Sequence, residues 1–112
     1  MQRGEIHLAI FPFGDVATMK LRPVLLTGPL GIAPEVLVAY ISSIIPGSLL
    51  ASDILLDPRQ PEHHSTRLKS VSVLRLHKLA TIHSTSLQRY LGKISTVTQH
   101  EVDARLRILL NL

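Results

Sequence analysis

The chain has 112 residues, a formal net charge of +4 and no cysteine. This length predicts a single domain over residues 1–112, and a hydrophobic content of 46% excludes a largely disordered chain. The lack of cysteine excludes disulfide frameworks and cysteine-ligated metal sites. The basic balance favours a polyanionic partner, either nucleic acid or an acidic protein segment.

The N-terminal part predicts two strands joined by a loop. Apolar and polar residues alternate from Glu5 to Ile10, which indicates a half-buried strand. The second strand runs from about Arg22 to Thr27 and begins at Pro23, because proline donates no hydrogen bond to a sheet. Arg22 then lies at the mouth of a rigid strand, where a cation is well placed to meet phosphate.

The third predicted strand, Val36 to Ile41, is apolar on both faces. Such a strand is covered twice, by the core and by a further layer, for which a second copy of the chain is one candidate. The apolar stretch that contains it ends at Pro46 and is shorter than the roughly 20 residues of a membrane span. With Glu5 near the N-terminus, where a signal peptide would be apolar, we expect a soluble, cytoplasmic protein.

The rest of the chain predicts a loop, short strands and one helix. The middle segment 57–64 contains two prolines and is expected to be a loop, and strand character returns at Ser70 to Leu76. A helical turn is expected at Ser84 to Tyr90, and a strand-like piece near Lys93 and Ile94.

A C-terminal helix is indicated by Val102, Leu106 and Leu109 at the spacing i, i+4, i+7. Ser95 and Thr98 are rival N-cap residues. Short strands followed by one amphipathic helix predict a mainly β protein with a helix (α+β), in which the helix closes a small barrel or curled sheet.

Metal-based and serine-based catalysis have little support in the sequence. The six histidines show no metal-ligand spacing with a carboxylate, so no metal or other cofactor is predicted. Neither a Gly-x-Ser-x-Gly elbow nor a phosphate-binding glycine loop is present.

What remains is a set of cations and hydroxyls at strand ends: Arg22, Ser42, Ser43, Arg75 and His77. Arg75 and His77 are two residues apart and therefore share a face of a continuing strand. A ribonuclease without a metal needs a base, an acid and a cation that stabilises the charged phosphorane, and histidine and arginine suit these roles. Each residue also has a plainer interpretation as a surface arginine, a turn serine or a solvated strand end.

Six motifs in order resemble the PemK/MazF-like family, the toxins of type II toxin–antitoxin systems, in its short-loop branch. They are Arg3–Ile6, Phe11–Asp15, Lys20–Leu25, Val38–Ser43, Ser70–Thr81 and the closing pair Leu91–Ser95 with Glu101–Asp103. The resemblance implies an SH3-like small β-barrel closed by the C-terminal helix, and usually a homodimer. It also implies a metal-independent endoribonuclease that cuts single-stranded RNA and is neutralised by an antitoxin with an acidic tail.

The resemblance assigns roles to individual residues. The implied catalytic residues are Arg22, Ser42 and His77, and the implied RNA-binding residues are Lys20, Phe13, Ser43, Val73, Arg75 and Lys78. His77 stands where aspartate is usual, and Arg67-Leu68 stands where glycine-leucine is common. A second hypothesis therefore stays open: a catalytically weak or inactive member that acts by binding a protein, either an antitoxin or a gyrase-type target.

Overall fold

The computed structural model describes residues 1–11, 20–28 and 34–112 of the chain. The elements in chain order are β1 (Glu5–Phe11), β2 (Lys20–Leu26), β3 (Glu35–Ser42), β4 (Asp53–Leu56), the 3-10 helix η1 (Pro61–Thr66), β5 (Ser72–His83), the 3-10 turn η2 (Ser84–Ser86), β6 (Leu87–Lys93) and α1 (Thr96–Leu110). Some strands that pair in the sheet lie far apart in the sequence, as β1 and β6 do.

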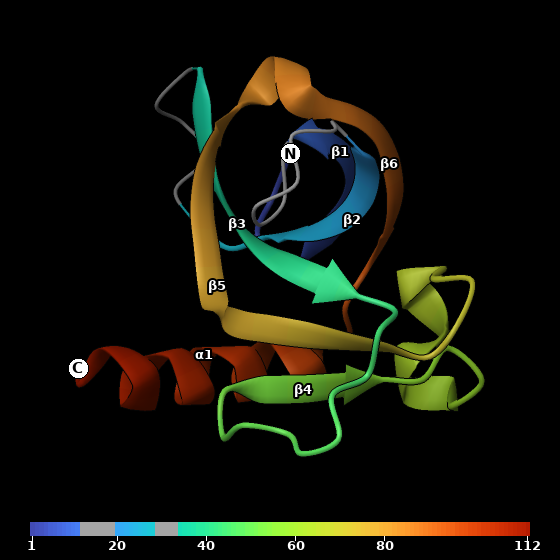
Figure 1. Cartoon of the computed structure of the whole chain (residues 1–112), viewed down its shortest axis with the longest axis vertical. Coiled ribbons are helices and arrows are strands. Elements are labelled where there is room, and N and C mark those ends of the chain that lie inside the picture. Colours follow the sequence, from blue (N-terminus) through green and yellow to red (C-terminus); the bar gives the residue numbers. More distant parts are fainter. Residues whose placement is uncertain (12–19, 29–33) are drawn as a thin grey trace.

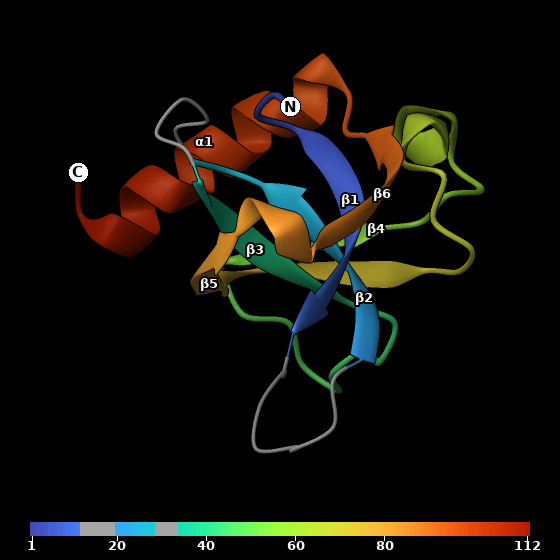
Figure 2. The same ribbon diagram turned by 90° about the horizontal axis from the view of Figure 1, so that it is seen from above.

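The strands form one antiparallel sheet in the order β4-β5-β3-β2-β1-β6. Figure 1 shows this sheet curling so that β5 and β6 arch over β1, β2 and β3, with α1 and β4 side by side below. Figure 2 shows α1 crossing one side of the curled sheet. The predicted α+β class, a small curled β-sheet with a C-terminal helix, is confirmed.

The core consists of two clusters on opposite faces of the sheet. The larger one joins β1 to β5 and includes Val102 of α1, with Leu106 packed against it. The smaller one contains Val36 and Val38 of β3, together with residues of β1, β2 and β5. The double burial predicted for Val36 to Ile41 is therefore confirmed, but both covers come from this chain, because the sheet curls back over β3.

Of the two residues predicted as alternative N-caps of the C-terminal helix, Ser95 is the one observed. The backbone N–H of Thr98 donates to Ser95 Oγ over 3.1 Å, so Ser95 is the N-cap and Thr98 lies inside the first turn. Val102 is fully buried, whereas Leu109 is 39% exposed and has left the core face. The apolar stripe thus covers the core only over the first three turns or so of the helix.

Several expected elements were wrong in their bounds. No element was predicted where strand β4 lies, and only a loop was predicted where helix η1 lies. Strand β5 was predicted to end at Leu76, but it continues to His83. Only Ser84–Ser86 form the helical turn expected to reach Tyr90, since Leu87–Lys93 pair with β1 as β6. Pairing with a distant strand decides the structure of such short segments, and local sequence does not show it.

Candidate functional site

The sheet register brings residues of four strands into one row. Val24 of β2 pairs with Tyr40 of β3, Tyr40 pairs with Arg75 of β5, and Arg75 pairs with Asp53 of β4. Residues directly opposite each other in a sheet project from the same face. Asp53 and Arg75 therefore lie on the face that carries Tyr40.

Arg22 and Ser42 belong to the next row on that face. Each lies two residues beyond the Val24–Tyr40 pair, in the same direction along antiparallel strands, so their side chains project to the same side. Ser42 pairs with Val73 across β3 and β5. The register thus places Arg22, Ser42 and Arg75, which are far apart in the sequence, on neighbouring strand ends.

Asp53 lies at the β4 end of the row that contains Tyr40 and Arg75. Its side chain is 0% exposed, and it accepts two hydrogen bonds from Arg75, from Nε to Oδ1 over 3.0 Å and from Nη2 to Oδ2 over 3.2 Å. Oδ2 also accepts the backbone N–H of Leu50 over 2.9 Å. This bidentate geometry holds the guanidinium plane of Arg75 in one orientation.

His77 faces the same carboxylate. Its Nδ1 lies 3.8 Å from Asp53 Oδ1, and its side chain is 28% exposed. The prediction that Arg75 and His77 share a face agrees with this common neighbour. The imidazole is thus partly accessible on one side and close to a fixed anion on the other.

The electrostatics of Asp53 follow from its surroundings. Burial would raise the pKa of this carboxyl group, but the Arg75 hydrogen bonds, the Leu50 N–H and the charges of Arg75 and His77 outweigh burial and lower its pKa. Asp53 is therefore an anion at neutral pH and a permanent counter-charge to Arg75.

Arg22 differs from Arg75 in making no ion pair with a carboxylate of residues 1–11, 20–28 or 34–112. Its Nε is buried and makes no hydrogen bond to the described residues. The residue lines a cavity of about 370 Å³ at the strand ends of β1, β2, β3 and β6. Lys69 and Arg89 line the same cavity, so Arg22 belongs to a locally cationic site.

The two serines after β3 have different surroundings. Ser42 Oγ accepts the backbone N–H of Ile44 over 3.1 Å and donates to its carbonyl over 3.4 Å, so the hydroxyl stabilises the turn. It keeps one lone pair for a further partner. Ser43 is exposed and lines the 370 Å³ cavity.

The remaining predicted residues fall into three groups. Lys20 and Lys78 are exposed, and Lys78 Nζ lies 5.5 Å from the centroid of the Tyr40 ring. Val73 is fully buried, so its side chain has no surface to offer RNA. Phe13 lies outside the described residues.

Sequence reasoning missed Asp53. The residue lies after a serine and before the apolar run Ile54 to Leu56, in a segment with no alternation long enough to indicate a strand. A lone acid at the head of a short apolar run was the available signal. Only the pairing of β4 with β5 brings it opposite Arg75.

Two further features concern metals and membranes. Within residues 1–11, 20–28 and 34–112, no three histidines or acids are grouped in a way that could hold a metal ion. None of the helices described has the length and apolar character needed to cross a bilayer.

Comparison with known proteins gives one family and one fold. A sequence model described as the PemK-like, MazF-like toxin of type II toxin–antitoxin systems matches residues 2–110. A search of curated proteins gave no significant match.

Two solved structures illustrate the fold. The Mycobacterium tuberculosis toxin MazF-mt6 is 23% identical, with coverage of 96% of this chain and 97% of that one and a TM-score of 0.75. An endoribonuclease in complex with its cognate antitoxin, from a mycobacterial species, is 15% identical, with coverage of 98% and 94% and a TM-score of 0.73. At these identities the likeness establishes a shared fold.

Proposed function

The chain belongs to the PemK-like, MazF-like toxins of type II toxin–antitoxin systems, and we propose that it is a metal-independent endoribonuclease. Its substrate is single-stranded mRNA, cut at short sequences so that translation and growth stop. The solved structures of similar fold support this proposal, since one of them is an endoribonuclease bound to its antitoxin. The observation that carries it is the buried Nε of Arg22, which has no hydrogen-bond partner in the described part of the chain and lies on the face that holds Arg75 and His77.

The proposed reaction uses the ribose itself as nucleophile. The 2′-oxygen attacks the adjacent phosphorus and its proton passes to a base. The bond from phosphorus to the 5′-oxygen breaks, which leaves a 2′,3′-cyclic phosphate, and the departing 5′-oxygen takes a proton from water to become a hydroxyl. His77 is the candidate base, because its imidazole is partly accessible and lies beside a fixed carboxylate. Arg22 stabilises the negative charge that grows on the phosphorane oxygens.

Asp53 acts in this scheme through its neighbours. It keeps Arg75 in one orientation for contact with the RNA backbone, and it places a negative charge 3.8 Å from the His77 ring. In the PemK/MazF-like family that the sequence resembles, aspartate is usual at the position of His77. The buried carboxylate of Asp53 supplies an anion next to this position from a different strand.

The decisive experiment is cleavage of varied single-stranded RNAs by the purified protein in the presence of a chelator. We expect cleavage, and Arg22→Ala should lower it by about 100-fold or more, the usual cost of removing one group that stabilises developing charge. Arg107→Ala, which removes an exposed cation of α1, is the matched control and should cleave like the parent protein.

Absence of cleavage across many RNA sequences and pH values would overturn the enzyme proposal. It would favour the alternative, a protein that keeps the fold and acts by binding an antitoxin or a gyrase-type target. Folding of Arg22→Ala is checked by circular dichroism, so that a lost activity is not a lost structure.

The proposal includes partners and a compartment. We propose a homodimer in the cytoplasm, inhibited by a cognate antitoxin whose acidic tail meets the basic face. Large apolar side chains are exposed between β3 and β4, and they support a protein contact there: Ile44, Ile45, Leu49 and Leu50. A monomer at micromolar concentration in light scattering would contradict the dimer.

A further inference from the structure

Two cavities adjoin at the loop that follows η1. The first, of about 370 Å³, contains Arg22 and Arg89, and the second, of about 700 Å³, contains His64 and Arg67. Both are lined by Leu68 and Lys69, so the two cavities are neighbours, and together they are here named the basic trough. It begins at Arg22 and leads away from the proposed active site over the η1–β5 loop.

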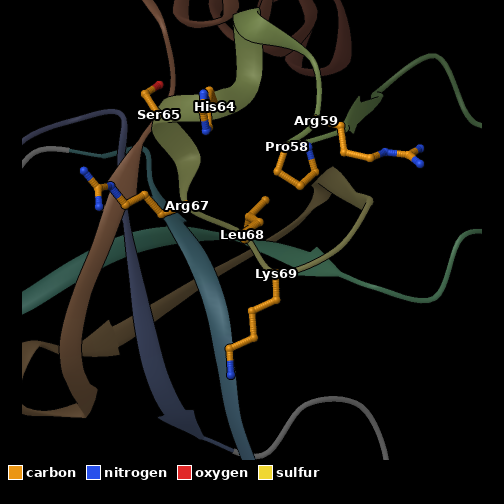
Figure 3. Close-up of a pocket in the computed structure, with 7 residues that line it drawn as sticks. All are labelled: Pro58, Arg59, His64, Ser65, Arg67, Leu68 and Lys69. Carbon is orange, nitrogen blue, oxygen red and sulfur yellow. The ribbon is translucent and has the colours of Figure 1, made fainter.

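Figure 3 shows how the cations of this loop point. Arg67 and Lys69 extend to the side of the loop where β1, β2 and β6 lie, whereas Arg59 extends to the opposite side. Arg59 also bonds to Asp57, with Nη2 and Oδ2 2.9 Å apart. Arg67 and Lys69 are therefore the cations of the larger cavity that have no carboxylate partner among the described residues. Arg22 and Arg89 line the smaller cavity.

The trough contains cations without counter-ions. No carboxylate lines either cavity, and within the described residues no hydrogen bond or ion pair neutralises the side chains of Arg22, Arg67, Lys69 or Arg89. Four other arginines have carboxylate partners: Arg3 with Asp103, Arg59 with Asp57, Arg75 with Asp53, and Arg105 with Glu101. A concave surface with several unneutralised cations attracts an anionic ligand.

The backbone at Arg67 is in an unusual state. Its φ is 57° and ψ is 25°, the left-handed region that glycine adopts without cost and most other residues avoid. An arginine here gives up some stability and gains a cation on the wall of the trough. Arg67 is the C-cap of η1, and its N–H donates to the carbonyl of His64, so the turn that ends this helix also fixes the backbone that carries the cation.

The loop that carries these cations is held firmly against β6. Ser65 Oγ donates to the carbonyl of Lys93 over 2.8 Å, and Thr66, fully buried, donates to the carbonyl of His63 over 2.7 Å. Gly92 allows this close approach, because an added Cβ would lie 2.4 Å from the Ser65 carbonyl oxygen. Arg67 and Lys69 thus project from a fixed support, which lowers the entropy lost on binding.

We propose that the trough binds the single strand of RNA that flanks the cleaved phosphodiester, with Arg67, Lys69 and Arg89 as phosphate contacts. The inference rests on the proposed function for its ligand, since Arg22 links the trough to the site of cleavage. Apolar side chains that line the smaller cavity, Leu8 and Leu91 among them, offer a surface for a base. Alternating cations and apolar surface match the phosphates and bases of a nucleotide chain.

The test measures binding of uncleavable oligonucleotides, fully 2′-O-methylated, by fluorescence anisotropy across a salt series. Arg67→Gly, Lys69→Ala and Arg89→Ala should each weaken binding of an octanucleotide by about tenfold. Combined, they should flatten the slope of log K against log salt by about 2, since each single-strand phosphate contact contributes about 0.7. A dinucleotide, too short to leave the Arg22 site, should show little difference.

The variant Arg67→Gly distinguishes a loss of RNA affinity from a loss of folding stability. Because glycine relieves the positive φ, its melting temperature should equal or exceed that of the parent protein while RNA affinity falls. Arg107→Ala, which removes the same charge from an exposed helix surface, is the control and should bind like the parent. In cleavage assays the trough variants should raise KM and leave kcat nearly unchanged.

Octanucleotide affinities equal to that of Arg107→Ala would overturn the inference. So would loss of binding only to an acidic peptide such as oligoglutamate, which would make the trough a protein-binding surface. The two proposals fail separately. Trough-dependent binding without cleavage contradicts the ribonuclease alone, and Arg22-dependent cleavage with normal octanucleotide binding in the trough variants contradicts the trough alone.

Discussion

Two groups of arginines in this protein are used in opposite ways. Arg75 is locked by two hydrogen bonds to Asp53, whose side chain is wholly buried. Arg22, Arg67 and Arg89 border open cavities and pair with no described carboxylate. The first arrangement orders the sheet and orients one cation, and the second leaves charge available to a ligand.

The difference follows from the cost of burying charge. A buried carboxylate is tolerated only with partners, so Asp53 and Arg75 depend on each other for stability. Arg67 and Arg89 are exposed cations in a concave site, and they remain solvated until a ligand replaces the water. Removing a residue of the first group should therefore affect folding, and removing one of the second group should affect binding.

The largest expected effect is that of Asp53→Ala. Loss of the carboxylate leaves Arg75 partly buried without a partner, and we expect the free energy of unfolding to fall by about 3 kcal/mol. Urea denaturation at pH 7 measures this. Asp57→Asn, which breaks the solvent-facing pair with Arg59, is the control and should change stability little. Equal losses for the two variants would show that burial does not distinguish the pairs.

The pH dependence of stability sharpens the same contrast. The pKa of Asp53 is lowered from its ordinary value of 3.8, so the folded state binds its proton more weakly than the unfolded state. The stabilisation by Asp53 is then fully present above about pH 5 and is lost as pH falls through the lowered pKa. The difference in unfolding free energy between the parent and Asp53→Asn should be constant near neutrality and shrink below pH 3.8.

Glu5 and Asp103 also have lowered pKa values, because hydrogen bonds from His7 and Arg3 outweigh their desolvation. These two groups titrate in the parent protein and in Asp53→Asn alike, so the difference between the two unfolding free energies reports the titration of Asp53 alone. A difference that grows on acidification would contradict the assigned direction.

The smallest expected effect concerns His77→Asp. If His77 is the base, a carboxylate in its place ionises at lower pH, and the acidic limb of the kcat/KM profile should move to lower pH. The new carboxylate would lie close to that of Asp53, and their repulsion should limit this shift. Asp57→Asn serves again as the control, and an unchanged profile would show that His77 transfers no proton.

The sequence allowed much of the fold to be predicted. Alternation in β1, the apolar β3 and the spacing around Val102 follow from local periodicity, and each is confirmed. The bounds of β6 and the existence of β4 could not be predicted from the sequence. Both are edge strands whose structure comes from pairing with β1 and β5, and their own residues show no clear alternation.

The candidate site divides in the same way. Arg22, Ser42 and Arg75 could be selected as strand-end residues, and their common face follows from the register. Asp53 and Lys69 could not, because one acid and one lysine among many carry no local signature. The turn-forming hydrogen bonds of Ser42 belong to the plainer interpretation that the sequence left open.

By itself the sequence determined the class of the fold, the family and the residue types available for phosphate chemistry. The tertiary structure alone decided which cations are neutralised and which are free, since pairing depends on neighbours such as Asp53 and Arg75, 22 residues apart. Charge is a property of a residue, but its availability depends on burial and partners. These arise only when β4 pairs with β5 and the loop after η1 packs on β6.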